Sequence, residues 1–479
     1  MRPHELCTRL SISERTASRL DWERATVMQY VSTRGKVEPV SFSQAVAQGL
    51  APDGGLFLPK QLPSLTEYLD RWKSLAYPDL CFEFMRLFAT DIPEAVLRSA
   101  VDAAYEGFDH ADTAPVKSLS DNLYICELFH GPTLAFKDFA LQLLGRLYAY
   151  QIQQTGHPIN VLGATSGDTG SAAIHGLMNL PGIRIFILYP KNGVAELQEK
   201  QMTCTGSSSV FPIAIDGSFD DAQRCIKQLF GDLEFKQERQ LSAINSINLA
   251  RVLAQCVYYL YAWFRIPETK RNNLEVIVPT GNFGNVLAGW ILSKMGVAIP
   301  KFRIATNRND ILYRLFKTGV YEVSAVNASL APSMDIQVAS NFERFLYYLT
   351  GEDPEKVSAT MKTFLETGYY RFEAFDTLNF SVSRSSDESI LANIASVYKS
   401  YGYVLDPHTA CAFEENDSPL ETRLVMATAH PAKFPDAIRQ ALNIEVTHPT
   451  LEALKSKAVV RYEMDSDPEV IREFIRSNS

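Results

Sequence analysis

A single lysine stands where a predicted loop meets a predicted helix, inside an otherwise apolar stretch. The segment Gly131–Ala140 follows a predicted strand, Leu123–Phe129, and leads into apolar residues at helical spacing over Phe139–Tyr150. Lys137 thus falls in the first turn of the helix, where the helix dipole and partial burial both favour the neutral amine. A neutral amine can form a Schiff base with a carbonyl compound. The alternative is a lysine whose ammonium group simply reaches solvent.

Two glycine-containing loops lie further along the chain, each between a predicted strand and a predicted helix. They are Ala164–Gly170, between Ile159–Gly163 and Ser171–Leu177, and Pro279–Asn285, between Leu274–Val278 and Val286–Lys294. Such a loop can aim backbone N–H groups and a helix N-terminus at an anion, although many similar loops bind nothing. Neither matches a Walker loop or Gly-x-Gly-x-x-Gly, so a nucleotide is not indicated. Together with Lys137 they indicate a phosphorylated carbonyl cofactor and an anionic substrate.

Pyridoxal 5′-phosphate has these properties, because it offers an aldehyde, a phosphate and an electron-accepting ring. Its pyridine nitrogen needs a partner, and Thr428 is the first polar side chain after a predicted strand, Arg423–Ala427. A hydroxyl there would leave the nitrogen largely unprotonated, whereas a carboxylate would keep it charged. The alternative for Thr428 is a turn or helix-capping residue.

The same segments, taken together and in order, resemble the threonine synthase family of the bacterial and fungal type. The resemblance starts at Met28 and covers nearly the whole remaining chain. Two small departures, Leu249 where the family often has tryptophan and Ala195-Glu196 where it often has Ser-Pro, do not touch the lysine or the cofactor loops. The matching segments are Tyr30–Gly35, Gly49–Phe57, Phe129–Asp138, Thr165–Ala172, Gln198–Met202, Asn245–Arg251, Pro279–Asn285 and Thr428–Phe434.

The resemblance implies an α/β protein of the fold-type II class of pyridoxal-phosphate enzymes, with two parallel-sheet subdomains and an N-terminal accessory domain. It also implies a lyase that converts O-phospho-L-homoserine and water to L-threonine and phosphate, the last step of threonine biosynthesis. One alternative is a phospho-lyase on the same scaffold that releases 2-oxobutyrate, ammonia and phosphate. Another is a non-catalytic relative that serves as a binding partner, which the presence of Lys137, Gly281 and Thr428 disfavours.

Site residues follow from the matching motifs. Lys137 is the expected catalytic residue and cofactor anchor, and Thr428 the expected partner of the ring nitrogen. Arg251 is favoured for the substrate phosphate because its guanidinium binds in a bidentate manner. An acid at Asp168 is unexpected beside two anions. The other expected cofactor residues are Gly281, Asn282, Phe283, Gly284 and Asn285, and the other expected substrate residues are Thr165, Ser166, Asp168, Thr169, Lys200 and Asn248.

Composition excludes several other classes of protein. The net charge of −9 and the lack of a sustained basic stripe argue against a nucleic-acid partner. No apolar run has the length of a membrane span. The seven cysteines are scattered without metal-ligand spacing, which is typical of reduced thiols in a cytosolic protein. We therefore expect no metal, a cytoplasmic location, and a monomer or homodimer.

The 479 residues predict several domains. We expect a disordered leader over 1–27, which carries acidic as well as basic residues and so differs from a transit peptide. The remaining ranges are an accessory domain over 28–115, a large cofactor-binding domain over 116–150 and 263–450, a small α/β domain over 151–262, and a C-terminal tail over 451–479. The accessory domain contains predicted helices at Phe42–Gln48, Leu65–Leu75 and Glu94–Tyr105.

Overall fold

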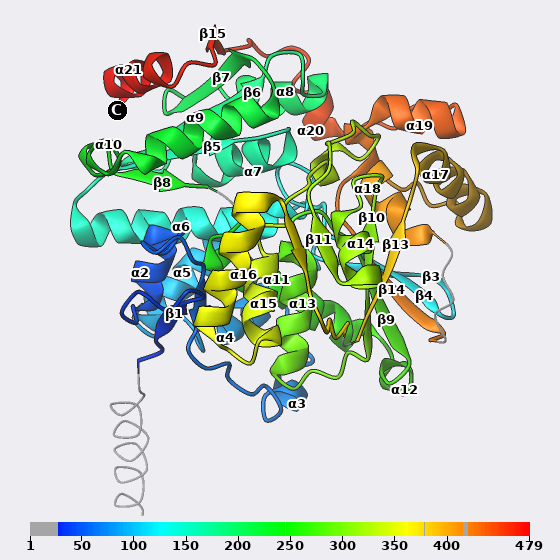
Figure 1. Ribbon diagram of the computed structural model, residues 1–479. Coiled ribbons are helices and arrows are strands. Elements are labelled where there is room, and N and C mark those ends of the chain that lie inside the picture. Colours follow the sequence, from blue (N-terminus) through cyan, green and yellow to red (C-terminus); the bar gives the residue numbers. More distant parts are fainter. Residues whose placement is uncertain (1–26, 245, 378, 415–419) are drawn as a thin grey trace, which may run out of the picture.

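Two mostly parallel sheets, each covered by helices, dominate the computed structural model, which describes residues 27–244, 246–377, 379–414 and 420–479 (Figure 1). The larger sheet has six strands, all parallel except β3 at one edge. Its strands in spatial order are β13 (Phe380–Arg384), β10 (Lys301–Thr306), β9 (Leu274–Pro279), β14 (Thr422–Ala427), β4 (Leu123–Glu127) and β3 (Val116–Ser120). Every residue of β9 is buried, as expected for a parallel strand covered on both faces.

The smaller sheet has five parallel strands. They are, in spatial order, β15 (Tyr462–Asp465), β7 (Val210–Asp216), β6 (Ile183–Pro190), β5 (Ile159–Ala164) and β8 (Leu241–Ala243). Its helices and connecting turns are α7 (Asp168–Leu177), α8 (Glu196–Thr203), α9 (Phe219–Gly231), α10 (Leu233–Glu238), α20 (Pro449–Glu452) and α21 (Pro468–Asn478). The predicted fold class, α/β with two parallel sheets, is confirmed.

The N-terminal part packs beside the long helix α6 (Lys137–Thr155) and forms a small antiparallel pair of strands with four helices (Figure 1). Its elements are β1 (Tyr30–Ser32), α2 (Phe42–Gln48), β2 (Phe57–Pro59), α3 (Leu69–Trp72), α4 (Tyr77–Met85) and α5 (Glu94–Tyr105). The helix expected over 65–75 is only the short α3, and Leu65 instead lies in a loop, where its N–H donates to the Met295 carbonyl. The leader lies outside the described residues except for Val27.

The remaining elements surround the large sheet. They are α11 (Leu249–Arg265), α12 (Glu268–Arg271), α13 (Gly284–Lys294), α14 (Ile311–Thr318), β11 (Val320–Glu322), α15 (Phe342–Leu349), α16 (Pro354–Thr367), β12 (Tyr369–Arg371), α17 (Asp387–Tyr401), α18 (Pro407–Ala410), α19 (Pro435–Leu442), and the 3-10 turns η1 (Pro332–Met334), η2 (Cys411–Phe413) and η3 (Pro431–Lys433). None of the helices in these described ranges combines the length and the apolar character that a membrane span requires.

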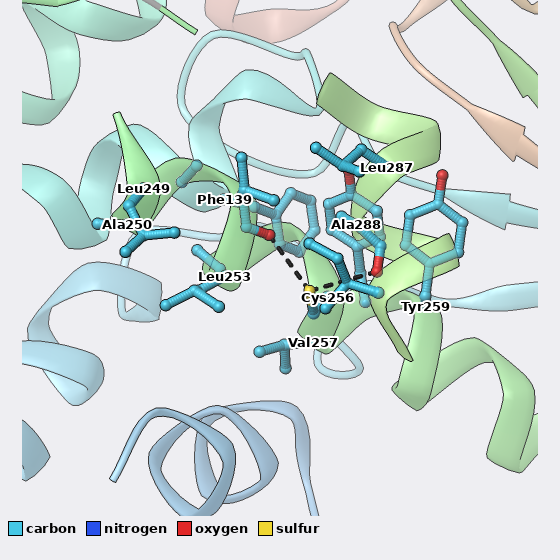
Figure 2. Close-up of a cluster of buried hydrophobic side chains, with 14 of the residues drawn as sticks. Phe139, Leu249, Ala250, Leu253, Cys256, Val257, Tyr259, Leu287 and Ala288 are labelled. Carbon is cyan, nitrogen blue, oxygen red and sulfur yellow. Dashed lines mark hydrogen bonds between the residues drawn. The ribbon is translucent and has the colours of Figure 1, made fainter. Parts of the chain in front are cut away.

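Helix α11 is buried along almost its entire length and belongs to the main core. It packs against α13, α6 and α4, and Figure 2 shows its apolar residues around Cys256. The Cys256 thiol donates to the Val252 and Ala288 carbonyls at 3.4 and 3.3 Å. The prediction placed most of this helix in the small domain; its contacts place it among the helices of the large sheet. Helices that are apolar all round are typical of a core.

The C-terminal segment, expected as a tail, completes the small sheet. Strand β15 pairs in parallel with β7, and α21 packs against α9 (Figure 1). Ile471 and Ile475 of α21 are fully buried in the core of this sheet. The segment thus covers an edge strand and its apolar face, both of which are costly to leave exposed. The division of the chain into domains stays a prediction.

The cysteines that the structure describes are all buried and free, namely Cys81, Cys126, Cys204, Cys225, Cys256 and Cys411. They act as small core residues, as the sequence predicted for most of them. Cys7 lies outside the described residues. Among the residues that the structure describes, no group of three histidine, cysteine, aspartate or glutamate side chains could hold a metal ion.

Candidate active site

A pocket opens where the strands of the two sheets end, and several loops far apart in the sequence line it. Open α/β sheets bind ligands at such carboxyl ends of strands. The lining residues are Phe136, Lys137, Asp168, Pro279, Thr280, Gly281, Asn282, Asn285, Ser333, Met334, His408 and Thr428. The loop before α6 and the loop after β14 run side by side here, since the Phe136 N–H donates to the Thr428 carbonyl at 2.9 Å.

Lys137 is the first residue of α6, as the sequence predicted, and its side chain is only 10% exposed. Its Nζ donates to Ser333 Oγ at 3.3 Å and lies 3.5 Å from Asp168 Oδ2. Burial lowers the pKa of Lys137 to about 8, with Asp168 opposing the shift and Lys433 and Arg251 adding to it. About a tenth of this amine is therefore unprotonated at pH 7, far more than for an ordinary lysine, and a nucleophile or base needs this neutral form.

Asp168, the unexpected acid, is the first residue of α7 and is buried beside two lysines. Its Oδ1 lies 2.7 Å from Lys433 Nζ and accepts from Gln198 Nε2 at 2.8 Å. Its Oδ2 accepts from Ser333 Oγ at 2.9 Å. Burial works against ionisation, but Lys433 and Lys137 hold the pKa of Asp168 well below its usual range. The carboxylate is thus a fixed anion that neutralises cations within the site.

Ser333, His408 and Asp406 form a chain behind Lys137 that the sequence did not reveal. The Ser333 backbone N–H donates to His408 Nε2 at 3.1 Å, and His408 Nδ1 lies 3.0 Å from Asp406 Oδ1. Because Nε2 accepts a hydrogen bond, the ring proton resides on Nδ1 and is donated to the carboxylate. Asp406 and His408 are almost fully buried. The chain fixes the turn that carries the Ser333 hydroxyl.

The loop Pro279–Asn285, expected to cradle a phosphate, contributes Pro279, Thr280, Gly281, Asn282 and Asn285 to the pocket. Gly281 approaches another backbone closely, since a Cβ there would lie 3.2 Å from the Met334 Cα. The Asn282 side chain accepts from the Gly284 N–H at 3.0 Å and so caps α13. Phe283 has a left-handed backbone with φ of 67°, and its side chain is buried among Phe316, Phe342, Phe345 and Phe380. Only its backbone belongs to the loop, and Phe283 and Gly284 do not line the pocket.

Asn285 and Thr428 each bring an unused polar atom to the pocket. Asn285 Oδ1 accepts from the Tyr258 and Tyr259 hydroxyls at 2.7 and 2.8 Å, which fixes the orientation of the amide. Its Nδ2 and the Thr428 hydroxyl are buried and have no hydrogen-bond partner in the part of the chain that the structure describes. A buried polar atom without a hydrogen-bond partner lowers the stability of the fold, so these two atoms are suited to bind a ligand in the pocket.

Arg251 lies in the first turn of α11 and is almost fully buried. Burial lowers its pKa to about 10. Its Nε and Nη1 have no hydrogen-bond partner among residues 27–244, 246–377, 379–414 and 420–479. A buried guanidinium with free N–H groups close enough to lower the pKa of Lys137 is suited to bind an anion.

Other expected substrate residues are occupied elsewhere. The Thr165 hydroxyl accepts from the Gly167 and Gly170 N–H groups at 2.9 and 2.8 Å and so shapes its own loop. Asn248 caps α11 and donates to the Val46 carbonyl at 2.9 Å. Lys200 lies outside the pocket and pairs with Glu196 at 2.8 Å. Ser166 and Thr169 are partly buried in the loop and do not line the pocket.

Lys433 could have been found from the sequence, because it stands inside the Thr428–Phe434 segment that carried part of the resemblance. A lysine in an otherwise apolar stretch after a buried strand is the same signal that singled out Lys137. Ser333, Asp406 and His408 had no comparable signal, since they lie in or at the start of the short elements η1 and α18, whose sequences gave no motif.

Family models match almost the whole chain. A model described as "Threonine synthase N terminus" matches residues 29–105, and one described as "Pyridoxal-phosphate dependent enzyme" matches residues 113–360. A third, described as "Threonine synthase, C-terminal", matches residues 408–475 and so includes β15 and most of α21.

Individual relatives agree with these models. The chain is 42% identical to threonine synthase of Pseudomonas aeruginosa, over 86% of this chain and 90% of the relative. It is 40% identical to threonine synthase of Schizosaccharomyces pombe, over 87% and 90%. A crystal structure of threonine synthase from Brucella melitensis, titled as bound to pyridoxal phosphate, matches with a TM-score of 0.90 at 40% identity, over 94% of this chain and 99% of that one. The chain therefore belongs to the threonine synthase family of pyridoxal-phosphate-dependent enzymes.

Proposed function

We propose that this chain is a lyase that converts O-phospho-L-homoserine and water to L-threonine and phosphate, with Lys137 as the catalytic residue. The observation that carries the proposal is the buried amine of Lys137, whose pKa is lowered to about 8, in a pocket that residues of both glycine loops line. The relatives named threonine synthase support the choice of substrate.

The residues of the pocket fit pyridoxal phosphate. Lys137 offers a partly unprotonated amine to its aldehyde, and the unpaired Thr428 hydroxyl offers a partner to its ring nitrogen. Gly281 and Asn282 would hold its phosphate at the start of α13, where the helix dipole favours an anion, and Asn285 Nδ2 is a free donor close by. When bound, the cofactor supplies a ring that takes up negative charge from a substrate carbon.

Residues of the chain itself would move the substrate protons and balance the charge of the base. Once free, the Lys137 amine would remove the proton from Cα of the substrate and then serve Cβ and Cγ, because its four-carbon stem can swing between neighbouring atoms. Ser333 donates to Asp168 and accepts from Lys137, so it holds the amine near the carboxylate that balances its charge. This arrangement keeps one base in place while the proton moves.

Arg251 would bind the phosphate or the carboxylate of the substrate through its free Nε and Nη1. Binding an anion would supply the partner that this buried cation lacks. Ser166 and Thr169 would contribute donors from the loop before α7. The small sheet would close over the site to exclude water until it is needed at Cβ. We further infer a cytoplasmic monomer or homodimer with a small-molecule substrate and no nucleic-acid partner.

The test is a product assay on the purified full chain with O-phospho-L-homoserine. Phosphate and threonine should appear in equal amounts, with 2-oxobutyrate only a minor product. Lys137→Ala should lower the rate by about a thousandfold or more, because it removes both the anchor and the base. Lys362→Ala, at a lysine that is 75% exposed on α16, serves as the matched control. Phosphate accompanied mainly by 2-oxobutyrate would instead identify a phospho-lyase.

A further inference from the structure

Lys433 is a second buried lysine at the site, and the reaction proposed above does not use it. Its side chain is fully buried, and its Nζ lies 2.7 Å from Asp168 Oδ1 and donates to the Thr133 carbonyl at 2.7 Å. Lys137 Nζ lies 3.5 Å from the other oxygen of the same carboxylate. One buried anion is therefore shared between two buried lysines.

We propose that Lys433 is a positioning residue that holds the Asp168 carboxylate as a permanent ion pair and thereby makes Lys137 easier to deprotonate to its neutral, reactive form. The inference rests on the proposed role of Lys137 as cofactor anchor and base. Lys433 itself does not line the pocket and would act only through Asp168 and the loop that contains Thr133.

The geometry decides which of the two lysines gives up its proton. Lys433 donates to two oxygens at close range, one of them anionic, which favours its ammonium form. Lys137 has a longer contact with the carboxylate and a hydroxyl as its hydrogen-bond partner. Lys137 also stands at the N-terminus of α6, where the helix dipole disfavours a cation. Of two cations that share one anion in a buried site, Lys137 is thus the less stabilised.

The Asp168 carboxylate stays ionised, so protonation of Asp168 does not change the charge that the two lysines share. It is the first residue of α7, where the dipole favours an anion, and it accepts hydrogen bonds from Gln198 and Ser333. Its pKa lies well below the usual range despite its burial, because Lys433 and Lys137 lie beside it. The excess positive charge of the cluster must therefore be relieved at Lys137.

Other ionisable groups around the cluster act in both directions: Arg251 adds positive charge, and the Asp138 carboxyl, which is mostly ionised near pH 7, adds negative charge near Lys433. Arg251 adds to the positive charge and lowers the pKa of Lys137 together with Lys433. Burial lowers the pKa of His175 to about 4, so that ring is neutral. Burial raises the pKa of Asp138 to about 6, with its hydrogen bonds to Thr133 opposing the shift. The remaining groups are His408 and Asp406, which are hydrogen-bonded to each other behind Ser333.

The test measures how fast cofactor-depleted full-length protein takes up pyridoxal phosphate at different pH values, followed by absorbance. The rate depends on the fraction of Lys137 that is unprotonated, so in the wild type it should rise with pH through about 8. Lys433→Met and Lys433→Gln remove the cation at position 433, so that the Asp168 carboxylate can stabilise the ammonium form of Lys137 more strongly. Both should move the midpoint upward by about one pH unit and slow uptake near pH 7 by about tenfold.

Lys433→Arg is the matched control, because it keeps the charge and should leave the midpoint near that of the wild type. Lys433→Gln separates charge from hydrogen bonding, since its amide can still donate to the Thr133 carbonyl. A purely structural role would lower the melting temperature of the variants without moving the midpoint. The cofactor's own ionisations are common to every variant and cancel in the comparison.

Either of two results would overturn the inference: an unchanged or lower midpoint in a neutral variant that folds, or an equal upward shift in Lys433→Arg. If neither neutral variant takes up cofactor, Asp168→Asn decides, because loss of the anion should lower the midpoint, and any other result counts against the proposal. A wild type that takes up no cofactor would contradict the proposed function as well. If the wild type takes up cofactor with a midpoint near pH 8 and the neutral Lys433 variants have the same midpoint, only this inference is contradicted.

Discussion

The two glycine loops have similar sequence patterns, but they treat the N-terminus of the following helix differently. The loop before α7 places its own carboxylate, Asp168, at the helix start and pairs it with Lys433 and Lys137. The loop before α13 has no charged residue, and Asn282 caps the helix through Gly284. The N-terminus of α7 is therefore neutralised by a carboxylate of its own loop, whereas the N-terminus of α13 has no such carboxylate and could accept the anion of a ligand. A glycine loop alone does not specify an anion site; the side chains it carries decide.

The largest effect should come from removing the internal anion. Asp168→Asn leaves Lys433 buried without a charged partner, so the free energy of unfolding near pH 7 should fall by about 3 kcal/mol. Because the folded-state pKa of Asp168 is depressed, its contribution is fully present above the unfolded value of about 4 and is lost as the pH falls through the folded value. Denaturant unfolding at pH 7 and at pH 3 measures both effects.

In that experiment the difference between wild type and Asp168→Asn should narrow at the lower pH. Asp465→Asn, at an exposed residue of β15, serves as the control and should change stability little. A variant as stable as the wild type at pH 7 would show that the ion pair contributes nothing net, and that the two loops differ less than their charges suggest.

The second prediction places an anion in the loop that lacks one. Asn282→Asp keeps the oxygen that caps Gly284 but adds a negative charge where the cofactor phosphate is expected. The dissociation constant for pyridoxal phosphate should rise by about 30-fold, because the two negative charges repel each other. Titration of the cofactor-depleted protein with pyridoxal phosphate measures it. Asn192→Asp, in an exposed turn after β6, is the control, and equal affinities of all three proteins would remove Asn282 from the cofactor site.

The smallest effect distinguishes two buried threonines. Thr165→Val removes a hydroxyl that accepts from Gly167 and Gly170, so the free energy of unfolding of the cofactor-free protein should fall by about 1 to 2 kcal/mol. Thr428→Val removes a hydroxyl without a partner in the described ranges and should leave that stability unchanged or slightly higher. Thr428→Val should instead lower the turnover rate of the holoenzyme. Thermal unfolding and steady-state kinetics together test this, and an equal loss of stability in both variants would contradict it.

The sequence predicted the site where the signal was local. Lys137 proved to be the first residue of α6 because a short apolar strand, a glycine turn and an apolar helix follow one another directly in the chain. The two glycine loops could be found for the same reason, since strand, loop and helix are adjacent in sequence. The alternation of strands and helices along these segments is also typical of parallel sheets.

Only the tertiary structure decided which distant groups meet. Two of the partners of Asp168, Ser333 and Lys433, come from η1 and η3, and no sequence pattern states that either will lie beside it. Likewise β15 joins the small sheet from the far end of the chain. It pairs with the edge strand β7, and α21 covers the apolar face of the sheet, so segments distant in sequence complete this core. Hydrogen bonds within a turn depend on neighbours in sequence, whereas buried charge pairs depend on which surfaces the packed sheets bring together. The sequence by itself therefore indicated the lysine and its loops, and the tertiary structure determined which charged groups lie beside that lysine.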